Sequence, residues 1–313
     1  MATTLLVVIL WANALILKCS AYAWPNAVVD PSRVKQISWK PRAFVYDGFL
    51  TDMECDHLIY LARPELQRSQ VVDAENTAKS KLSDVRTSSG MFIPSAKVLL
   101  HVSIARWLCY CCLQDSIVAG IEAKLAAWTF YPPENGEDIQ VLRYEIGQKY
   151  EPHHDFFEDE HNLARGGNRV ATVLMYLSNV TKGGETVFPY AEVPQDRNAS
   201  DIEDLSECAQ RGIAVKPEKG RALLFFSLLP NTVGDNLSTH GGCPVIEGEK
   251  WSATRWIHQR PFTTSELQYD GVCKDLNENC RLWASMGECN ANPHYMVGSP
   301  VRPGHCRESC NVC

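Results

Sequence analysis

The chain has 313 residues, of which 45% are hydrophobic and 21% charged, a composition typical of a globular protein with one sizeable core and a small appendage. The formal net charge is −7 and no run of basic residues occurs, so neither nucleic acid nor an anionic membrane surface is expected as a partner.

The N-terminal residues are typical of a secretory signal peptide. The apolar stretch LLVVILWANALIL is ended by Lys18 and is short for a transmembrane helix. Ala21-Tyr22-Ala23 follows, with the small-x-small pattern that signal peptidase cleaves. We therefore expect residues 1–23 to be removed and the mature chain to lie in the lumen of the endoplasmic reticulum or Golgi. An uncleaved anchor is the alternative, and only then would a membrane be a partner.

Two helices are expected ahead of the first long strands. Thr51 and Glu54 form a capping-box pattern before CDHLIYLA. The second helix follows Asp115, a candidate N-cap, in DSIVAGIEAKLAAW. Its apolar residues at helical spacing are Ile117, Ile121, Leu125 and Trp128. This face is expected to pack onto a sheet.

From Val141 onward the sequence changes to short β-branched and aromatic runs interrupted by Gly, Pro and Asn. The expected strands are VLRYEIG, RVATVLMYLS, GIAVKP, ALLFFSL and WSATRWIHQ. Short strands after two helices predict an α+β fold, an antiparallel sandwich or jelly roll with helices on its outside. An acidic segment after GGETVFP is expected to be a surface loop. Glycosylation sequons begin at Asn179, Asn198 and Asn236.

Six of the thirteen cysteines lie in residues 273–313. An even number in a short tail behind a signal peptide indicates a disulfide framework. Zinc is the weaker interpretation, because the tail lacks the two CxxC pairs that such sites favour. Cys208 and Cys243 are candidates for a further bridge, and Cys55 is expected to be a free thiol packed in its helix.

The stretch YEPHHDFF contains the strongest chemical signal. On a strand, residues two apart face the same side, so His153 and Asp155 are paired and His154 is turned away. His240, in DNLSTHGGCPVIEGEKW, is the histidine in a comparable setting. Two histidines and one carboxylate on one face are typical of non-haem Fe(II) oxygenases. Zinc hydrolases use similar ligands, and histidines beside aromatic residues are often structural.

Lys250 separates these alternatives. It stands ten residues after His240, at the start of an expected strand. An oxygenase that uses 2-oxoglutarate needs a cation for the distal carboxylate of that cosubstrate, and a desolvated lysine supplies one. A zinc hydrolase has no such need. Taken alone, Lys250 would be interpreted as a surface lysine.

Four long motifs resemble the catalytic domain of plant-type prolyl 4-hydroxylases. They are LRYEIGQKYEPHHDFF, NRVATVLMYLSNVTKGGETVFP, KGRALLFFSLLPN and STHGGCPVIEGEKWSATRWIH. The resemblance covers roughly residues 38–262 and implies a double-stranded β-helix (jelly-roll) core. The tail, residues 273–313, resembles the ShK-toxin-like (ShKT) module, which implies the pairs Cys273–Cys313, Cys280–Cys306 and Cys289–Cys310.

The resemblance implies roles for nine residues. His153, Asp155 and His240 would bind Fe(II). Lys250, Tyr144 and Thr186 would hold the distal carboxylate of 2-oxoglutarate. Tyr150, Arg169 and Trp256 would line the groove for the peptide substrate. The implied reaction is hydroxylation of peptidyl proline to 4-hydroxyproline, coupled to oxidative decarboxylation of 2-oxoglutarate to succinate and CO2, with O2 as second cosubstrate and L-ascorbate keeping the iron reduced.

The implied substrates are proline-rich chains in a polyproline II conformation, such as extensin-like and arabinogalactan-type cell-wall glycoproteins. A catalytically inactive binder of proline-rich chains is the alternative, and residues 98–114, VLLHVSIARWLCYCCLQ, favour it. The family pattern has no counterpart to this apolar insertion, which is interpreted as a neutral insertion, a gene-model error or a functional loop. Because such a strip must be buried, it invites misfolding.

Overall fold

The structure is a computed structural model that describes residues 29–72, 80–82, 84–94, 115–193, 204–262, 275, 279–297 and 306–312. The expected signal peptide, the insertion at 98–114, the sequon at Asn198 and the Cys273–Cys313 pair lie outside the described residues. None of the helices in the described part combines the length and hydrophobicity that a membrane crossing requires.

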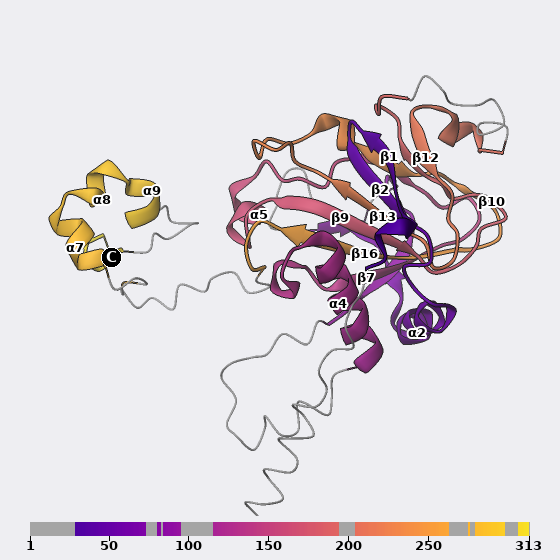
Figure 1. The fold of residues 1–313 in the computed structure, drawn as a ribbon, viewed down its shortest axis with the longest axis horizontal. Coiled ribbons are helices and arrows are strands. Elements are labelled where there is room, and N and C mark those ends of the chain that lie inside the picture. The colour runs from indigo at the N-terminus through magenta and orange to yellow at the C-terminus, as the bar shows by residue number, and fades with distance from the viewer. Residues whose placement is uncertain are drawn as a thin grey trace, which may run out of the picture.

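Two antiparallel sheets form the main body of the described chain (Figure 1). The larger sheet has the order β1 (Val34–Trp39), β2 (Arg42–Tyr46), β13 (Ala222–Phe226), β9 (Arg169–Tyr176), β16 (Lys250–His258), β7 (Ile139–Tyr144), β6 (Ser89–Ile93) and β3 (Gln67–Arg68). The smaller sheet has the order β12 (Ile213–Val215), β11 (Thr186–Phe188), β14 (His240–Gly242) and β8 (Tyr150–His153). The fold is therefore mixed α/β with antiparallel sheets.

Two small two-stranded antiparallel sheets complete the strands of the described residues. They pair β4 (Gln70–Val72) with β5 (Ser80–Leu82), and β10 (Lys182–Gly183) with β15 (Val245–Glu247). The five strands expected from the sequence correspond to β7, β9, β12, β13 and β16. All nine residues of β16 are buried, because one face of this central strand packs in the hydrophobic core and the other lines a cavity shared with the smaller sheet. A strand covered on both faces needs no polar alternation.

The two expected helices are confirmed. In α2 (Asp52–Ala62), the Thr51 hydroxyl accepts from the Glu54 backbone N–H and the Glu54 carboxylate accepts from the Thr51 N–H, which completes the capping box. In α4 (Ser116–Thr129), Asp115 Oδ1 accepts from two backbone N–H groups of the first turn. The other Asp115 oxygen lies 2.7 Å from His57 Nε2, so this cap also ties α4 to α2.

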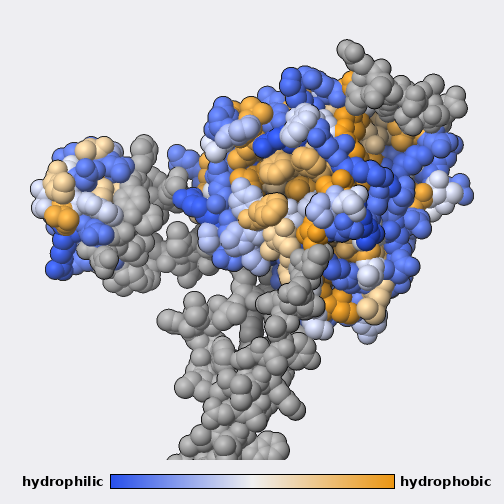
Figure 2. All heavy atoms as spheres, viewed as in Figure 1, coloured by the Kyte–Doolittle hydropathy of each residue, from blue (hydrophilic) through white to orange (hydrophobic). Residues whose placement is uncertain are grey.

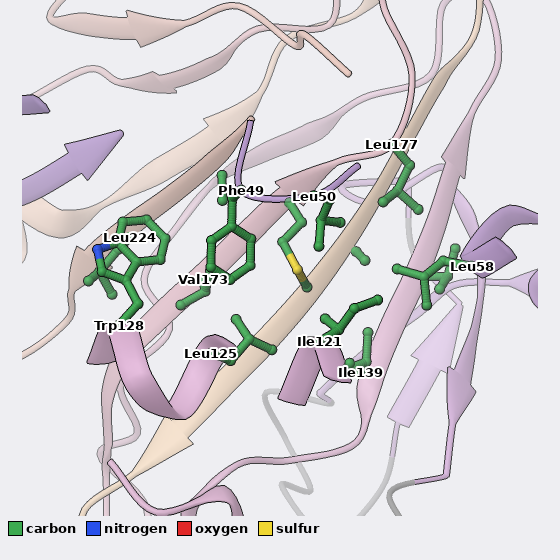
Figure 3. Packing of buried hydrophobic residues seen from close by; sticks show 14 of the residues in the cluster. Phe49, Leu50, Leu58, Ile121, Leu125, Trp128, Ile139, Val173, Leu177 and Leu224 are labelled. Carbon is green, nitrogen blue, oxygen red and sulfur yellow. The ribbon is translucent and has the colours of Figure 1, made fainter. Parts of the chain in front are cut away.

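The hydrophobic core lies between these helices and the larger sheet. Ile121, Leu125 and Trp128 of α4 point toward Phe49 and Val173 (Figure 3), and all five side chains are buried. Burial of large apolar side chains of this kind stabilises a fold by about 1.5–3 kcal/mol each. The apolar face predicted for α4 therefore packs on the sheet as expected.

Figure 2 shows one face of the described chain coloured by hydropathy. Hydrophobic residues gather near the middle of the visible face of the sheet domain, with hydrophilic residues around them.

The C-terminal part contains three short helices, α7 (Cys280–Ser285), α8 (Glu288–Ala291) and α9 (Pro293–Met296). The expected disulfides Cys280–Cys306 and Cys289–Cys310 link α7 and α8 to residues 306–312.

Two further cysteine predictions are confirmed in the main body. Cys208 and Cys243 form a disulfide that joins the segment after the acidic loop to the residue that follows β14. Cys55 is a buried free thiol on α2, and burial raises its pKa to about 11. A protonated, buried thiol is a small hydrophobic group, so Cys55 belongs to the core.

Candidate active site

Three candidate metal ligands converge where β8 and β14 pair. His240 on β14 lies directly opposite His153 on β8. Asp155 follows two residues after the end of β8 and is buried. Its two carboxylate oxygens each lie 3.7 Å from one imidazole, Oδ1 from His153 Nε2 and Oδ2 from His240 Nε2. One ligand atom from each residue lies within 4.8 Å of the other two, which is the separation that a shared metal ion requires.

Hydrogen bonds orient all three side chains. His153 Nδ1 lies 2.8 Å from the Glu151 carbonyl oxygen, and His240 Nδ1 lies 3.0 Å from the Ser238 carbonyl oxygen. Each imidazole therefore donates from Nδ1 and presents Nε2 to the shared point. The Thr172 hydroxyl donates to Asp155 Oδ2 at 2.6 Å.

The charge states suit a divalent metal. Burial lowers the pKa of His153, and the neighbouring His240 lowers it further, so the imidazole is neutral. Burial alone would raise the pKa of Asp155, but His240 and His153 outweigh it and the pKa is lowered, which keeps the carboxylate ionised. Two imidazole nitrogens and one ionised carboxylate oxygen on one side of a point fit Fe(II) and leave the opposite coordination positions open.

His154 is turned away from this cluster. It is exposed, and its ring stacks on Phe156 with centroids 4.1 Å apart. The strand on which the prediction relied ends at His153, so Asp155 reaches the cluster from the residues that follow β8 rather than from the ladder itself. Side chains still alternate between the two faces from His153 to Asp155, so His153 points into the cluster and His154 points away from it.

One cavity contains eight of the nine residues singled out from the sequence. Its lining includes Tyr144, Tyr150, His153, Asp155, Thr186, His240, Lys250 and Trp256. These side chains come from both sheets, so the cavity lies between them. Arg169 is not part of the lining. Its guanidinium carbon lies 4.2 Å from the centre of the Trp256 ring, and it contacts the cavity through that ring.

A cationic end of the cavity is built around Lys250. Lys250 pairs with Tyr144 across β16 and β7, and only 3% of its surface is exposed. Its Nζ atom lies 5.4 Å from the Tyr144 ring centre and 5.7 Å from that of Tyr176. Burial lowers the pKa of Lys250 to about 8, and Glu185 opposes this shift. Among the described residues, no acceptor forms a hydrogen bond or ion pair with this ammonium group.

Thr186 and two tyrosines complete the cationic end. Thr186 is buried, and its Oγ1 accepts from the Tyr176 hydroxyl at 2.8 Å. Burial raises the pKa of Tyr176, so this phenol stays protonated and donates. An ammonium group without a counter-ion in contact, beside hydroxyl groups, suits a carboxylate ligand.

Three polar residues near the cavity were missed from the sequence. Arg86 lines the cavity, lies 4.8 Å above the Tyr150 ring centre and donates to Gln140 at 2.8 Å. Glu137 accepts from Arg169 Nε at 2.6 Å and lies 2.9 Å from His258 Nε2. Burial would raise the pKa of Glu137, but Arg169 and His258 lower it to about 2. Only the folded topology brings these positions together, and in the sequence they stand out only as charged residues in or beside strands.

The aromatic wall beside the ligands is ordered by stacking. The Tyr150 ring stacks on His153 with centroids 3.7 Å apart, and burial raises the pKa of Tyr150 to about 12. The Arg169 guanidinium lies between the rings of Trp256 and Phe157, at 4.2 and 4.6 Å from their centres. These contacts fix the aromatic side chains that border the open metal positions.

Comparison with known proteins gives consistent matches. A sequence model of the 2OG-Fe(II) oxygenase superfamily matches residues 139–258. Prolyl 4-hydroxylase 2 of Arabidopsis thaliana is 59% identical over 290 residues, covering 92% of this chain and 91% of that protein. Probable prolyl 4-hydroxylase 4 of the same plant is 59% identical over 289 residues, with coverage of 92% and 91%. A solved viral collagen prolyl hydroxylase from Paramecium Bursaria Chlorella virus-1, in a 2OG complex, is 26% identical with a TM-score of 0.46, covering 69% of this chain and 94% of that one.

Proposed function

Because this chain belongs to the prolyl 4-hydroxylase family of 2OG-Fe(II) oxygenases, we propose that it hydroxylates peptidyl proline to 4-hydroxyproline at the cavity between its two sheets. The family implies Fe2+, 2-oxoglutarate and O2 as the cofactor and cosubstrates. The observation that carries the proposal is the convergence of His153, Asp155 and His240 within 4.8 Å, in the same cavity as the buried Lys250.

In this proposal the two histidines and Asp155 bind Fe(II) through Nε2 and carboxylate atoms. The bound iron supplies the oxidising chemistry that couples decarboxylation of 2-oxoglutarate, to succinate and CO2, with hydroxylation of proline at C4. The hydrogen bonds to Nδ1 and to Asp155 Oδ2 keep the three ligand atoms aimed at one point before the metal arrives. Such preorganisation removes a reorganisation cost from the reaction.

The cationic end orients the cosubstrate. Lys250 Nζ binds the distal carboxylate, and Thr186 and Tyr144 contribute hydroxyl groups beside it. Because Lys250 is buried, this ion pair forms in a low-dielectric environment and is stronger than it would be in water. With its distal carboxylate held there, the cosubstrate would keep its 1-carboxylate and oxo group for the metal that His153, Asp155 and His240 would hold.

The aromatic wall binds the peptide. Tyr150 and Trp256 offer flat faces to pyrrolidine rings, and Arg169 positions Trp256 by stacking on it. An extended polyproline II chain presents successive rings to such a wall at low entropic cost. The substrates proposed are proline-rich chains of extensin-like and arabinogalactan-type wall glycoproteins. L-Ascorbate is proposed as the reductant that restores Fe(II).

The domain boundaries are part of the proposal. Residues 38–262 would form the catalytic domain, with the two antiparallel sheets as a double-stranded β-helix and the 98–114 insertion within it. Residues 273–313 would form an ShKT module, an assignment that the two disulfides of the described C-terminal segment support. Residues 1–23 would be a signal peptide, and the mature protein would work in the lumen of the endoplasmic reticulum or Golgi.

The test is turnover on a polyproline peptide. Purified full-length protein with Fe2+, 2-oxoglutarate, O2 and ascorbate is expected to form 4-hydroxyproline and succinate in equal amounts. Chelation of the metal should stop both products. Peptide binding without either product would instead support an inactive binder, and succinate formed only with a proline-free peptide would overturn the substrate assignment.

A further inference from the structure

Lys250 lies where the ladders of the larger sheet end. On one side it pairs with Tyr144, the last residue of β7. On the other side, the pairing of β16 with β9 begins at Ser252, opposite Tyr176, which is the last residue of β9. The ladder between β9 and β16 therefore stops two residues short of Lys250, the residue to which the proposed function assigns the distal carboxylate.

A side chain continues the connection where this ladder stops. The Leu177 N–H donates to the Trp251 carbonyl oxygen at 2.9 Å, and the next residue, Ser178, reaches β16 through its hydroxyl. Ser178 Oγ accepts from the Trp251 N–H at 2.8 Å and donates to the Glu249 carbonyl oxygen at 3.0 Å. A single hydroxyl thus bridges the two peptide groups that flank Lys250 in the chain.

The backbone around Ser178 is fixed from its other side. The Gly220 N–H donates to the Tyr176 carbonyl oxygen at 2.9 Å, and the Lys219 N–H donates to Asn179 Oδ1 at 2.8 Å. These contacts tie the end of β9 and the residue after Ser178 to the segment before β13. Ser178 lies between them, so its hydroxyl reaches β16 from a fixed position.

The position of the Lys250 ammonium group depends on this backbone. Lys250 Nζ forms no hydrogen bond or ion pair within the described part of the chain, and the ring centres of Tyr144 and Tyr176 lie 5.4 and 5.7 Å from it. The next side chain, Trp251, points to the opposite face of the sheet and is buried in the hydrophobic core. With no polar contact at its head group, the lysine takes its position from its own peptide groups, and the Ser178 hydroxyl is bonded to both of them.

We propose that Ser178 is a positioning residue for the cosubstrate: its hydroxyl fixes the two peptide groups around Lys250 and so sets where the ammonium group meets the distal carboxylate of 2-oxoglutarate. The inference rests on the proposed function of the cavity, in which Lys250 binds that carboxylate. A charge-assisted hydrogen bond depends on the distance and direction between its partners, so a displacement of about 1 Å weakens it. The two candidate histidine ligands lie on β8 and β14 of the smaller sheet, away from this bridge.

A purely structural role for Ser178 makes a different prediction. Its side chain is half-buried, and loss of its two hydrogen bonds would then destabilise the local fold for every ligand alike. A positioning role affects only those ligands that reach Lys250. N-oxalylglycine resembles 2-oxoglutarate and carries a distal carboxylate, whereas oxalate has only the group of oxygens that chelates a metal. Comparison of these two ligands therefore separates the two roles.

The experiment measures the binding of both ligands directly. Full-length wild-type protein and Ser178→Ala are loaded with redox-inert Zn2+, and dissociation constants for N-oxalylglycine and oxalate are measured by isothermal titration calorimetry. Ser178→Ala should bind N-oxalylglycine about tenfold more weakly than wild type, the factor expected when one charge-assisted hydrogen bond is weakened. Its dissociation constant for oxalate should stay within about twofold of the wild-type value.

Further variants make each outcome decisive. Lys250→Ala, alone and combined with Ser178→Ala, completes a double-mutant cycle. Because Ser178 acts through Lys250, Ser178→Ala should cause no further loss of N-oxalylglycine affinity once Lys250→Ala is present. Ser178→Thr retains the hydroxyl and should restore the wild-type affinity for N-oxalylglycine. Ser178→Cys fills a similar space with weaker hydrogen bonds, and it takes the place of Ser178→Ala if the alanine variant does not fold.

Three results would overturn the proposal: an equal loss of affinity for both ligands in Ser178→Ala, no loss for either ligand, or an additive loss in the double variant. The proposed function would survive these results as long as Lys250→Ala weakens the binding of N-oxalylglycine. If Lys250→Ala binds N-oxalylglycine as wild type does, the role of Lys250 in the proposed function fails, and the role of Ser178 fails with it.

Discussion

The sheet domain and the C-terminal cysteine-rich segment are stabilised by different means. In the sheet domain, one cluster of buried apolar residues joins α2, α4 and the larger sheet. In the described C-terminal segment, the fully buried members of its cluster are Cys280, Met296 and Cys306, and two disulfides link α7 and α8 to residues 306–312. A segment of this size cannot bury enough apolar surface to fold without cross-links.

This difference determines where chemistry can be located. A large core can hold buried charges such as Lys250, Glu137 and Asp155, because apolar burial elsewhere offsets the cost of desolvating them. A small cross-linked segment buries too little apolar surface to offset the cost of desolvating a charge. We therefore expect catalysis and sensitivity to buried charge to belong to the sheet domain, and sensitivity to reduction to belong to the C-terminal segment.

The largest effect is expected from removing one ligand in the sheet domain. Asp155→Ala deletes the carboxylate that lies 3.7 Å from both imidazoles. Metal binding then depends on two histidines, so turnover should fall by at least about 1,000-fold. Succinate release and the iron content of the purified protein provide the measurement.

His154→Ala is the matched control, because His154 is adjacent in sequence but stacks on Phe156 away from the ligands. Its activity should remain within roughly threefold of wild type, as for a typical surface change. Equal losses in both variants would mean that the assignment of faces around β8 is wrong.

A buried ion pair in the sheet domain should have the next largest effect. Arg255 on β16 lies 3.0 Å from Glu122 on α4, and both side chains are almost fully buried. Arg255→Leu leaves the Glu122 carboxylate buried without this partner and should lower the free energy of unfolding by about 4 kcal/mol. Urea unfolding followed by tryptophan fluorescence measures the change.

The surface pair of Arg143 with Glu249 supplies the comparison, since both side chains are about one-third exposed. Arg143→Leu should cost no more than about 1 kcal/mol. The double variant Arg255→Leu/Glu122→Leu should recover most of the lost stability, because no unpaired charge remains. If the buried and surface variants lost equal stability, the sheet domain would not depend on its buried charges.

A cross-link in the C-terminal segment tests the other half of the comparison. Cys280→Ala with Cys306→Ala opens a loop with a sequence separation of 26 residues. The chain-entropy relation gives a local loss of about 3–4 kcal/mol for such a loop. Hydrogen exchange should show residues 279–297 losing protection while β9 and β16 keep theirs. Loss of protection in β16 would mean that the two regions fold as one unit.

The sequence predicted the parts of the fold that depend on local pattern. The capping residues Thr51 and Asp115 mark the starts of both helices, and apolar spacing identifies the buried face of α4. The five expected strands are rich in β-branched and aromatic residues, which is why they were detected. Two-residue and three-residue strands such as β3 and β10 carry no comparable signal.

From residue chemistry and spacing alone, only the candidate metal ligands and Lys250 were predictable. The family resemblance supplied the other five candidates, Tyr144, Thr186, Tyr150, Arg169 and Trp256. HHD and the lysine after His240 fit a metal and a dicarboxylate, so those residues could be singled out. Arg86, Glu137 and His258 could not, because a charged residue beside a strand usually faces solvent. They are buried here because non-local contacts bring Arg86 against Tyr150 of β8 and Glu137 against His258 of β16.

The smallest effect concerns the pH dependence of stability around Glu137. The pKa of this carboxyl is lowered from 4.5 to about 2 in the folded state, because Arg169 and His258 outweigh the effect of burial. Because the folded state holds the ionised Glu137 carboxylate more favourably than the unfolded state does, this group stabilises the fold above pH 4.5. That contribution is lost as the pH falls toward 2. Its full size is on the order of 3 kcal/mol. Glu137→Gln cannot titrate, so the stability difference between wild type and variant should shrink over this interval.

The loss of stability caused by protonation of Glu137 should be confined to the sheet domain, because its partners Arg169 and His258 both lie there. Urea unfolding at several pH values from 6 to 2.5 gives the difference between the two proteins, and Asp155, whose pKa is also lowered, contributes equally to both and cancels. Hydrogen exchange in the same samples should show residues 279–297 unchanged. A stability difference that stayed constant with pH would mean that Glu137 acts by shape alone, and a parallel loss in the C-terminal segment would mean that the two regions share their electrostatic stability.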